Sequence, residues 1–289
     1  MLAIAVLAVS SAAIWVRLAM ETAGDRSVGF SLFLAASRLL VASAILLPNA
    51  SKLKSQSSSI KSLRYAAIAG ICLAGHFACW ITSLALTSIV ASTTLVTTNP
   101  IWVALLSWIF WHEKLTKSTF WSIATATTGG IIIAVGSAGD LDVGSNPLAG
   151  NLLALAGAIF ASLYILAGRQ AQKTLTTTSY ITVAYPTAAI AILPLSWLWQ
   201  TPYLGHAPLV YVYIFLMAVI CQLIGHTSYN WSLRWLSPAF VALTILLEPI
   251  ISGILGAIIF QEIPSATLLL GGCVVVLGVA IAIFQEAKN

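Results

Sequence analysis

The chain has 289 residues, of which 60% are apolar and only 7% are Asp, Glu, Lys or Arg. Soluble domains carry roughly 25% charged residues, so 13 basic and 8 acidic side chains cannot cover a water-facing surface of this size. The composition excludes a soluble enzyme, a nucleic-acid-binding protein and a disordered chain, and it predicts a membrane protein with several spans. The net charge of +5 is thinly spread and is not a basic binding surface.

Ten apolar segments follow one another along the chain, each close to the roughly 20 residues that a helix needs to cross a bilayer. They cover residues 2–20, 28–47, 65–86, 88–110, 118–137, 150–168, 179–199, 210–232, 237–260 and 265–284. Their apolar runs lack the period-two alternation of a transmembrane barrel, so each segment is predicted to be a helix. The first is expected to be a true span and not a signal peptide, because no basic residue precedes its apolar run.

The Lys and Arg residues predict the orientation, because cytoplasmic loops are enriched in them. With a cytoplasmic N-terminus, the inner side holds Lys52, Lys54, Lys61, Arg64, Lys114, Lys117, Arg169, Lys173, Arg234 and Lys288, which are ten of the thirteen. The outer loops carry Glu21, Asp25, Asp140, Asp142 and Glu262. We therefore predict a multi-pass protein of the cell (inner) membrane with both termini in the cytoplasm.

The two halves of the chain resemble each other. The stretch GHFACWITSLALTSIVASTTLVTTNPI begins at Gly75, and GHTSYNWSLRWLSPAFVALTILLEPI begins 150 residues later at Gly225. Further along, Asn99-Pro100 aligns with Glu248-Pro249 at an offset of 149. Five spans per repeat is an odd number, so the second half is expected to enter from the opposite face, which is typical of secondary transporters. The expected repeats are residues 1–142 and 143–289. The shared prolines are hinge candidates, with static kinks as the alternative.

The sequence resembles the EamA-type branch of the drug/metabolite transporter superfamily. The resemblance rests on SSAAIWVRLA, SRLLVAS and TTNPIWVALLSWIFWHEKLT in the first half, and on GHTSYNWSL and LLEPIISGILGAIIFQEIPS in the second. It implies an all-α integral membrane protein with ten transmembrane helices in two inverted five-helix repeats around a central cavity, with spans 5 and 10 at the periphery. The first span departs from the family, because Val9-Ser10-Ser11-Ala12 replaces the Trp-Gly-Ser-Asn run of many members. Substrate contacts of that span are therefore not carried over.

Two ionisable residues lie near the predicted midplane of the bilayer. Glu248 is about 16 Å from the inner end of its span at 1.5 Å per residue, and Arg38 lies at a similar depth. Burial disfavours the charged form of a carboxyl group, so Glu248 is a candidate for proton coupling or for binding a substrate amine, against a structural glutamate beside a proline. For Arg38 we favour a structural or gating role, which includes pairing with Glu248, over contact with an anionic substrate group.

The other candidates are polar and aromatic side chains at matching positions of the two halves. We predict that one central cavity is lined by His76, Trp80, Asn99, His226, Tyr229, Asn230 and Glu248, and that Arg38 faces it too. Aromatic surfaces with a few hydrogen-bonding groups suit an amphipathic ligand. The alternative for each histidine is a hydrogen bond between helices. No carboxylate lies within one turn of the histidines, and the cysteines lack a CxxC or Cys/His metal-binding pattern, so no metal site is expected.

The predicted function is a secondary active transporter that exports a small amphipathic metabolite, amino-acid-like or drug-like, by alternating access. An uncoupled facilitator or exchanger is the alternative. A membrane-embedded enzyme is a remote one, because the loops offer only His112-Glu113 and isolated acids. The expected partners are a small-molecule solute and the lipid bilayer, while protons and a homodimer are left open. No cofactor, metal or nucleic acid is expected.

Overall fold

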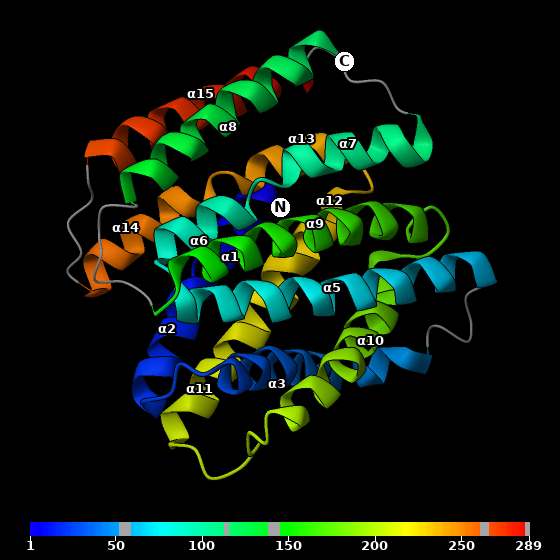
Figure 1. Cartoon of the computed structure of the whole chain (residues 1–289). Helices are drawn as coiled ribbons and strands as arrows, with labels where there is room; N and C mark the ends of the chain where they lie inside the picture. Colours follow the sequence, from blue (N-terminus) through cyan, green and yellow to red (C-terminus); the bar gives the residue numbers. More distant parts are fainter. Residues whose placement is uncertain (52–58, 113–115, 138–144, 261–265, 287–289) are drawn as a thin grey trace.

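The computed structural model describes residues 1–51, 59–112, 116–137, 145–260 and 266–286, which are mostly helical (Figure 1). The first half contains α1 (Leu2–Ser10), α2 (Ala12–Ala23), α3 (Val28–Leu46), the short 3-10 helix η1 (Leu47–Asn49), α5 (Ile60–Leu86), α6 (Ile89–Val96), α7 (Asn99–Trp111) and α8 (Lys117–Ser137). The second half contains α9 (Pro147–Ala171), α10 (Thr177–Leu198), α11 (Pro208–Leu216), the π-helical η2 (Met217–His226), α12 (Thr227–Ser232), α13 (Pro238–Ile245), α14 (Glu248–Phe260) and α15 (Ala266–Glu286).

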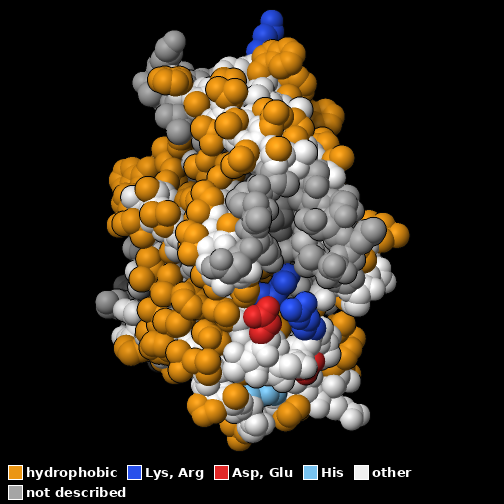
Figure 2. Space-filling view, turned by 90° about the vertical axis from the view of Figure 1, so that its left-hand side faces the viewer, with side chains coloured by type: hydrophobic (Ala, Val, Ile, Leu, Met, Phe, Trp, Pro, Cys, Tyr) orange, Lys and Arg blue, Asp and Glu red, His pale blue; other side chains and the backbone are white. Residues whose placement is uncertain are grey.

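Eight segments of the described chain are long and apolar enough to cross a membrane. They are Leu2–Ala23, Val28–Asn49, Ile60–Leu86, Ala91–Phe110, Pro147–Ala171, Thr177–Leu198, Pro208–Ser232 and Pro238–Phe260. The remaining two predicted spans correspond to α8 and α15, which are helices of 21 residues but are not among the eight. Hydrophobic side chains cover much of the surface in Figure 2, while most of the charged ones on the face shown gather in a small area below its centre, apart from a basic side chain at the top. Several residues used to predict the orientation lie outside the described residues, namely Lys52, Lys54, Lys114, Asp140, Asp142, Glu262 and Lys288.

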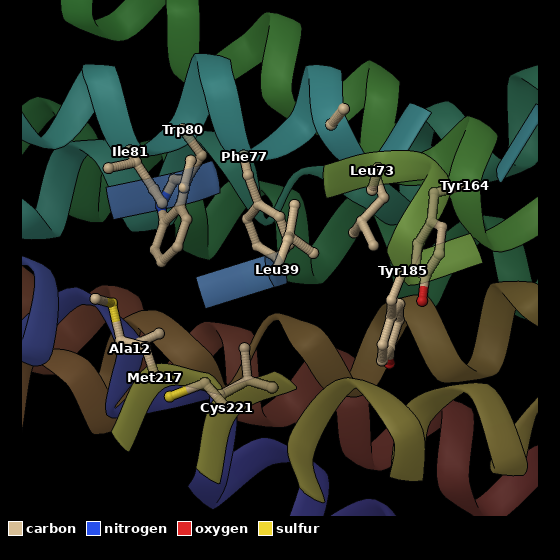
Figure 3. Packing of buried hydrophobic residues seen from close by; sticks show 14 of the residues in the cluster. Ala12, Leu39, Leu73, Phe77, Trp80, Ile81, Tyr164, Tyr185, Met217 and Cys221 are labelled. Atoms are coloured by element: carbon tan, nitrogen blue, oxygen red, sulfur yellow. The ribbon is translucent and has the colours of Figure 1, made fainter. Parts of the chain in front are cut away.

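The helices pack closely because small residues let their backbones approach, as is usual in membrane proteins. At Gly70, where α5 meets α10, an added Cβ would lie 2.5 Å from the Ala184 carbonyl oxygen. Next to this contact, Phe77 and Trp80 of α5 extend toward Met217 and Cys221 of η2 (Figure 3). The core between the first and second halves is therefore built from interdigitated aromatic and aliphatic side chains.

The fourth and ninth spans are each broken in two near their middle. α6 ends at Val96 and α13 ends at Ile245, each four residues before a proline, Pro100 or Pro249. A proline ring clashes with the carbonyl group four residues earlier and provides no N–H group, which favours a break there. Contacts join α6 to α14 and α7 to α13. The two broken spans therefore lie side by side and antiparallel, with the first part of each packed on the second part of the other.

α8 and α15 pack side by side (Figure 1). An added Cβ at Gly129 of α8 would lie 2.6 Å from the Gly271 oxygen, and one at Gly278 of α15 would lie 2.6 Å from the Ala126 nitrogen. An earlier residue of α8 thus meets a later residue of α15, so the two helices are antiparallel. Gly129 and Gly278 are repeat mates, separated by 278 − 129 = 149 positions. Equivalent helices of the two halves run in opposite directions at this contact.

Candidate functional site

A cavity of about 50 Å³ lies where the two broken spans meet α5, α9 and α12. It is lined by Val9, His76, Trp80, Val96, Thr97, Asn99, Ala161, Tyr164, Ile165, His226, Tyr229, Asn230, Leu233, Val241, Ile245 and Glu248. The structure brings together all seven side chains that the sequence analysis placed on the cavity wall. Arg38, the eighth candidate, is not among the lining residues.

Glu248 is half-buried and stands in the first turn of α14, directly after the break in the ninth span. Its Oε1 atom accepts a hydrogen bond of 2.9 Å from the hydroxyl group of Tyr229 on α12. The first turn of a helix has unpaired N–H groups and a partial positive charge, which favour a carboxylate at this position. The break therefore sets a carboxyl group on the cavity wall at a helix N-terminus.

Asn99 occupies the equivalent position in the first half, at the start of α7, and is buried. In the orientation that satisfies its surroundings, its amide nitrogen donates to the Val96 oxygen at 2.7 Å and to the Ala158 oxygen at 3.3 Å. The Ser162 hydroxyl group donates to the Asn99 backbone oxygen at 3.3 Å. Asn99 thus ties the break in the fourth span to α9, whereas Glu248 is held by the side chain of Tyr229.

Aromatic rings form one wall of the cavity. His76 and Trp80 lie parallel, with ring centroids 6.0 Å apart and planes inclined by 4°, and the His226 ring centroid is 6.4 Å from that of His76. The His76 Nδ1–H group donates to the Gly157 carbonyl oxygen at 3.0 Å. Trp80 Nε1 is buried and has no hydrogen-bond partner among the described residues. It is therefore a buried donor without a partner on a residue that lines the cavity.

Asn230 belongs to a polar network with two tyrosines that the sequence analysis did not identify. Its Nδ2 atom donates to the Tyr164 hydroxyl group at 2.5 Å and to the Tyr185 hydroxyl group at 3.4 Å. These two tyrosines lie next to each other in Figure 3. Tyr164 lines the cavity from α9, and its signal in the sequence is a phenol group within a helix of mostly small apolar residues.

Arg38 is completely buried behind the cavity wall. Its Nη2 atom donates to Gln222 Oε1 at 3.0 Å, and its Cζ atom lies 4.2 Å from the centroid of the Phe77 ring. The Phe77 ring is in turn 5.3 Å from the ring of His226, so Arg38 lies one ring away from the cavity. Arg38 therefore pairs with Gln222. The pairing with Glu248 that the sequence analysis considered is not formed. Within the described ranges, no three His, Cys, Asp or Glu side chains are grouped to hold a metal ion.

Gln222 holds Arg38 from η2, a stretch of ten residues in π-helical geometry. π-Helical turns are rare and are frequent at functional sites. The sequence signal for Gln222 is a single amide side chain in the apolar run MAVICQLIGH. This amide does not predict the contact with Arg38, because nothing in the sequence alone pairs positions 38 and 222.

Comparison with known proteins places these residues in a family. The model of the EamA-like transporter family matches residues 1–135 and 148–284. A search of curated proteins finds no match. Among solved structures, 29 chains match, and one described as "Crystal structure of protein" superimposes with a TM-score of 0.71 at 18% sequence identity, covering 99% of this chain and 98% of that chain. At this identity the likeness establishes the fold alone.

Proposed function

The chain belongs to the EamA-like transporter family, and we propose that it is a secondary active transporter that exports a small amphipathic solute by alternating access. Family membership makes the protein a membrane transporter. The direction, the class of solute and the mechanism are the proposal.

The observation that carries the proposal is the cavity where two broken, antiparallel helices from opposite halves of the chain meet. Transporters built from inverted repeats bind solutes near the midplane, between the repeats, at discontinuous helices. Here Asn99 starts α7, Glu248 starts α14, and both line the same cavity. The antiparallel packing of α8 on α15, where Gly129 meets Gly271 and Gly278 meets Ala126, supports two inverted repeats, residues 1–142 and 143–289, with α8 and α15 as the fifth and tenth spans.

The size of the cavity supports a contracted conformation. About 50 Å³ accommodates only a few water molecules, whereas pockets for metabolites measure about 300–1,000 Å³. We propose that the half-helices separate at Pro100 and Pro249 to admit the solute. In each broken span, the first part packs on the second part of the other span. If one such pair separates while the other stays packed, the cavity opens toward one side of the membrane only.

The chemistry of the wall supports an amphipathic solute, amino-acid-like or drug-like. The stacked rings of His76 and Trp80 offer a flat apolar surface. Trp80 Nε1 is a free donor among the described residues, and Glu248 is an acceptor for an amine or hydroxyl group. A flat solute with one donor and one acceptor group fits this combination, and the stacking also suits a cationic group.

The orientation in the membrane follows from the basic residues. Lys61, Arg64, Arg169, Lys173 and Arg234 lie at helix ends that the proposed ten-span topology places in the cytoplasm. With this topology both termini are cytoplasmic, and the protein resides in the cell (inner) membrane as an exporter. A proton that binds Glu248 would couple transport to the pH gradient, and an uncoupled facilitator or exchanger is the second candidate.

The test is transport by the full chain in liposomes. Metabolite pools are first screened by thermal shift in detergent, and each stabilising compound is then tested for counterflow in proteoliposomes. Counterflow of at least one compound is expected, and its accumulation should cease when the pH gradient is collapsed. Accumulation that persists without the gradient would favour the uncoupled alternative. If no stabilising compound shows counterflow, the proposal of solute transport fails.

A further inference from the structure

A second pocket lies beside the central cavity, at the ends of α9 and α12. Its volume is about 330 Å³. We call it the basic vestibule, and it is lined by Arg169, Gln172, Lys173, Leu233, Arg234 and Trp235. The proposed topology places it on the cytoplasmic side.

Three of the six lining residues are cations and none is acidic. Lys173 and Arg234 are exposed, so their charges remain mobile and hydrated. A cleft lined by charges of one sign raises the local concentration of counter-ions and speeds their association. Arg169 lies in the last turn of α9, where a cation also stabilises the helix end. Substitution of Lys173 and Arg234 therefore tests the charge of the vestibule without removing the cation that stabilises the end of α9.

The basic vestibule and the central cavity share part of their walls. Leu233 lines both spaces. Beside it, Gln172 of the vestibule donates a hydrogen bond of 3.0 Å from Nε2 to the backbone oxygen of Asn230, which lines the cavity. The Thr177 hydroxyl group donates to Gln172 Oε1 at 2.8 Å and fixes this amide. Leu233 and the hydrogen-bonded amide of Gln172 thus connect the walls of the two spaces.

We infer that the basic vestibule is a recruitment site for small solutes with a negatively charged group, such as a carboxylate or sulfonate, next to the cavity. Lys173 and Arg234 attract the anionic group, and Leu233 is common to the walls of the vestibule and the cavity. This inference rests on the proposed export function, because it assigns the vestibule to the loading side.

The test uses the rate of thiol modification at the mouth of the vestibule. Trp235→Cys, at an exposed lining residue, is treated in detergent with negative sulfonatoethyl or positive trimethylammonioethyl methanethiosulfonate. The ratio of the two rates is divided by the same ratio for free mercaptoethanol. We expect a preference for the negative reagent of about tenfold at low ionic strength, the lower end of such electrostatic effects, which weakens as salt is added. The parent chain measures the background from native cysteines.

Charge-neutral variants decide between the vestibule and a general excess of cytoplasmic cations. Lys173→Gln with Arg234→Gln should bring the normalised ratio close to one. Arg64→Gln, which removes an exposed cation outside the vestibule, should leave it unchanged. No preference at Trp235→Cys, or equal losses with Arg64→Gln, would overturn the inference. The assay needs no transported solute, so failure of the transport test would leave its result standing, and the reverse also holds.

Discussion

The hydroxyl group of Tyr229 donates a hydrogen bond of 2.9 Å to Glu248, which joins two side chains of the second half on the wall of the cavity. In the first half, Trp80 and Asn99 line the same cavity from α5 and α7. Trp80 Nε1 has no partner among the described residues, and the Asn99 amide donates to backbone oxygens. The two halves therefore hold their cavity-lining side chains in different ways, as expected if alternating access exchanges their arrangements.

Replacement of Glu248 by glutamine should separate coupling from binding. Glu248→Gln keeps the shape and can still accept from Tyr229, but it removes ionisation. Gradient-driven accumulation of a transported solute in proteoliposomes should fall to the level of empty liposomes, while counterflow persists. Glu248→Asp keeps an ionisable group and should retain part of the gradient-driven transport. Full gradient-driven transport by Glu248→Gln would leave a structural glutamate at this position.

Loss of the Gln222 amide should destabilise the protein. Gln222→Leu removes the acceptor from the buried Arg38 guanidinium group, and an unsatisfied buried polar group costs about 1–3 kcal/mol, more if it is charged. The midpoint of thermal unfolding in detergent should fall. Gln222→Glu keeps an acceptor and supplies the opposite charge, so it should be at least as stable as the parent chain. A Gln222→Leu protein with unchanged midpoint would show that Arg38 finds other acceptors.

Neighbouring glycines in α8 should respond differently to the same substitution. Gly129→Ala places a Cβ 2.6 Å from backbone atoms of α15, so the helices must move apart, and overpacking of this kind costs about 1–3 kcal/mol. At Gly130 the nearest atom is Thr94 Cγ2 at 3.5 Å, which is an ordinary contact. The midpoint temperature of thermal unfolding should therefore be lowered by Gly129→Ala and not by Gly130→Ala. Equal midpoints would mean that α8 and α15 do not pack as described.

Single cysteines should test the orientation. Ser51→Cys follows the second span and Ser145→Cys precedes α9, and both positions are exposed. In intact cells, an impermeant thiol reagent should label Ser145→Cys from outside, and should label Ser51→Cys only after the membrane is opened. The parent chain with its four native cysteines is the background. The opposite pattern would reverse the topology and place the basic vestibule outside.

The sequence predicted the family, which is confirmed, and the helical nature of the chain. It also named seven side chains that the structure brings to one cavity, because polar groups at midplane depth avoid lipid. The repeat supplied the pairing of Asn99 with Glu248. These inferences depend only on depth, polarity and period, which the sequence carries directly. Of the ten predicted spans, eight are matched in the described residues.

Two features depend on tertiary contacts and could not be read in advance. Prolines accompany the breaks before Asn99 and Glu248, yet α10 continues through Pro186 and Pro194 as one helix. A proline therefore permits a break, and the packing around it decides whether one forms. The partner of Arg38 depends on the π-helical turns of η2.

The antiparallel contact of α8 with α15 bears on how the protein is made. Gly129 of α8 requires a backbone of the last helix, residues 266–286, as its close neighbour. During synthesis, α8 leaves the ribosome long before that neighbour does. The surface that it will share with α15 therefore lacks its partner for most of translation. A chain truncated before α15 would leave this surface of α8 uncovered, and we expect such a chain to be a target for membrane quality control.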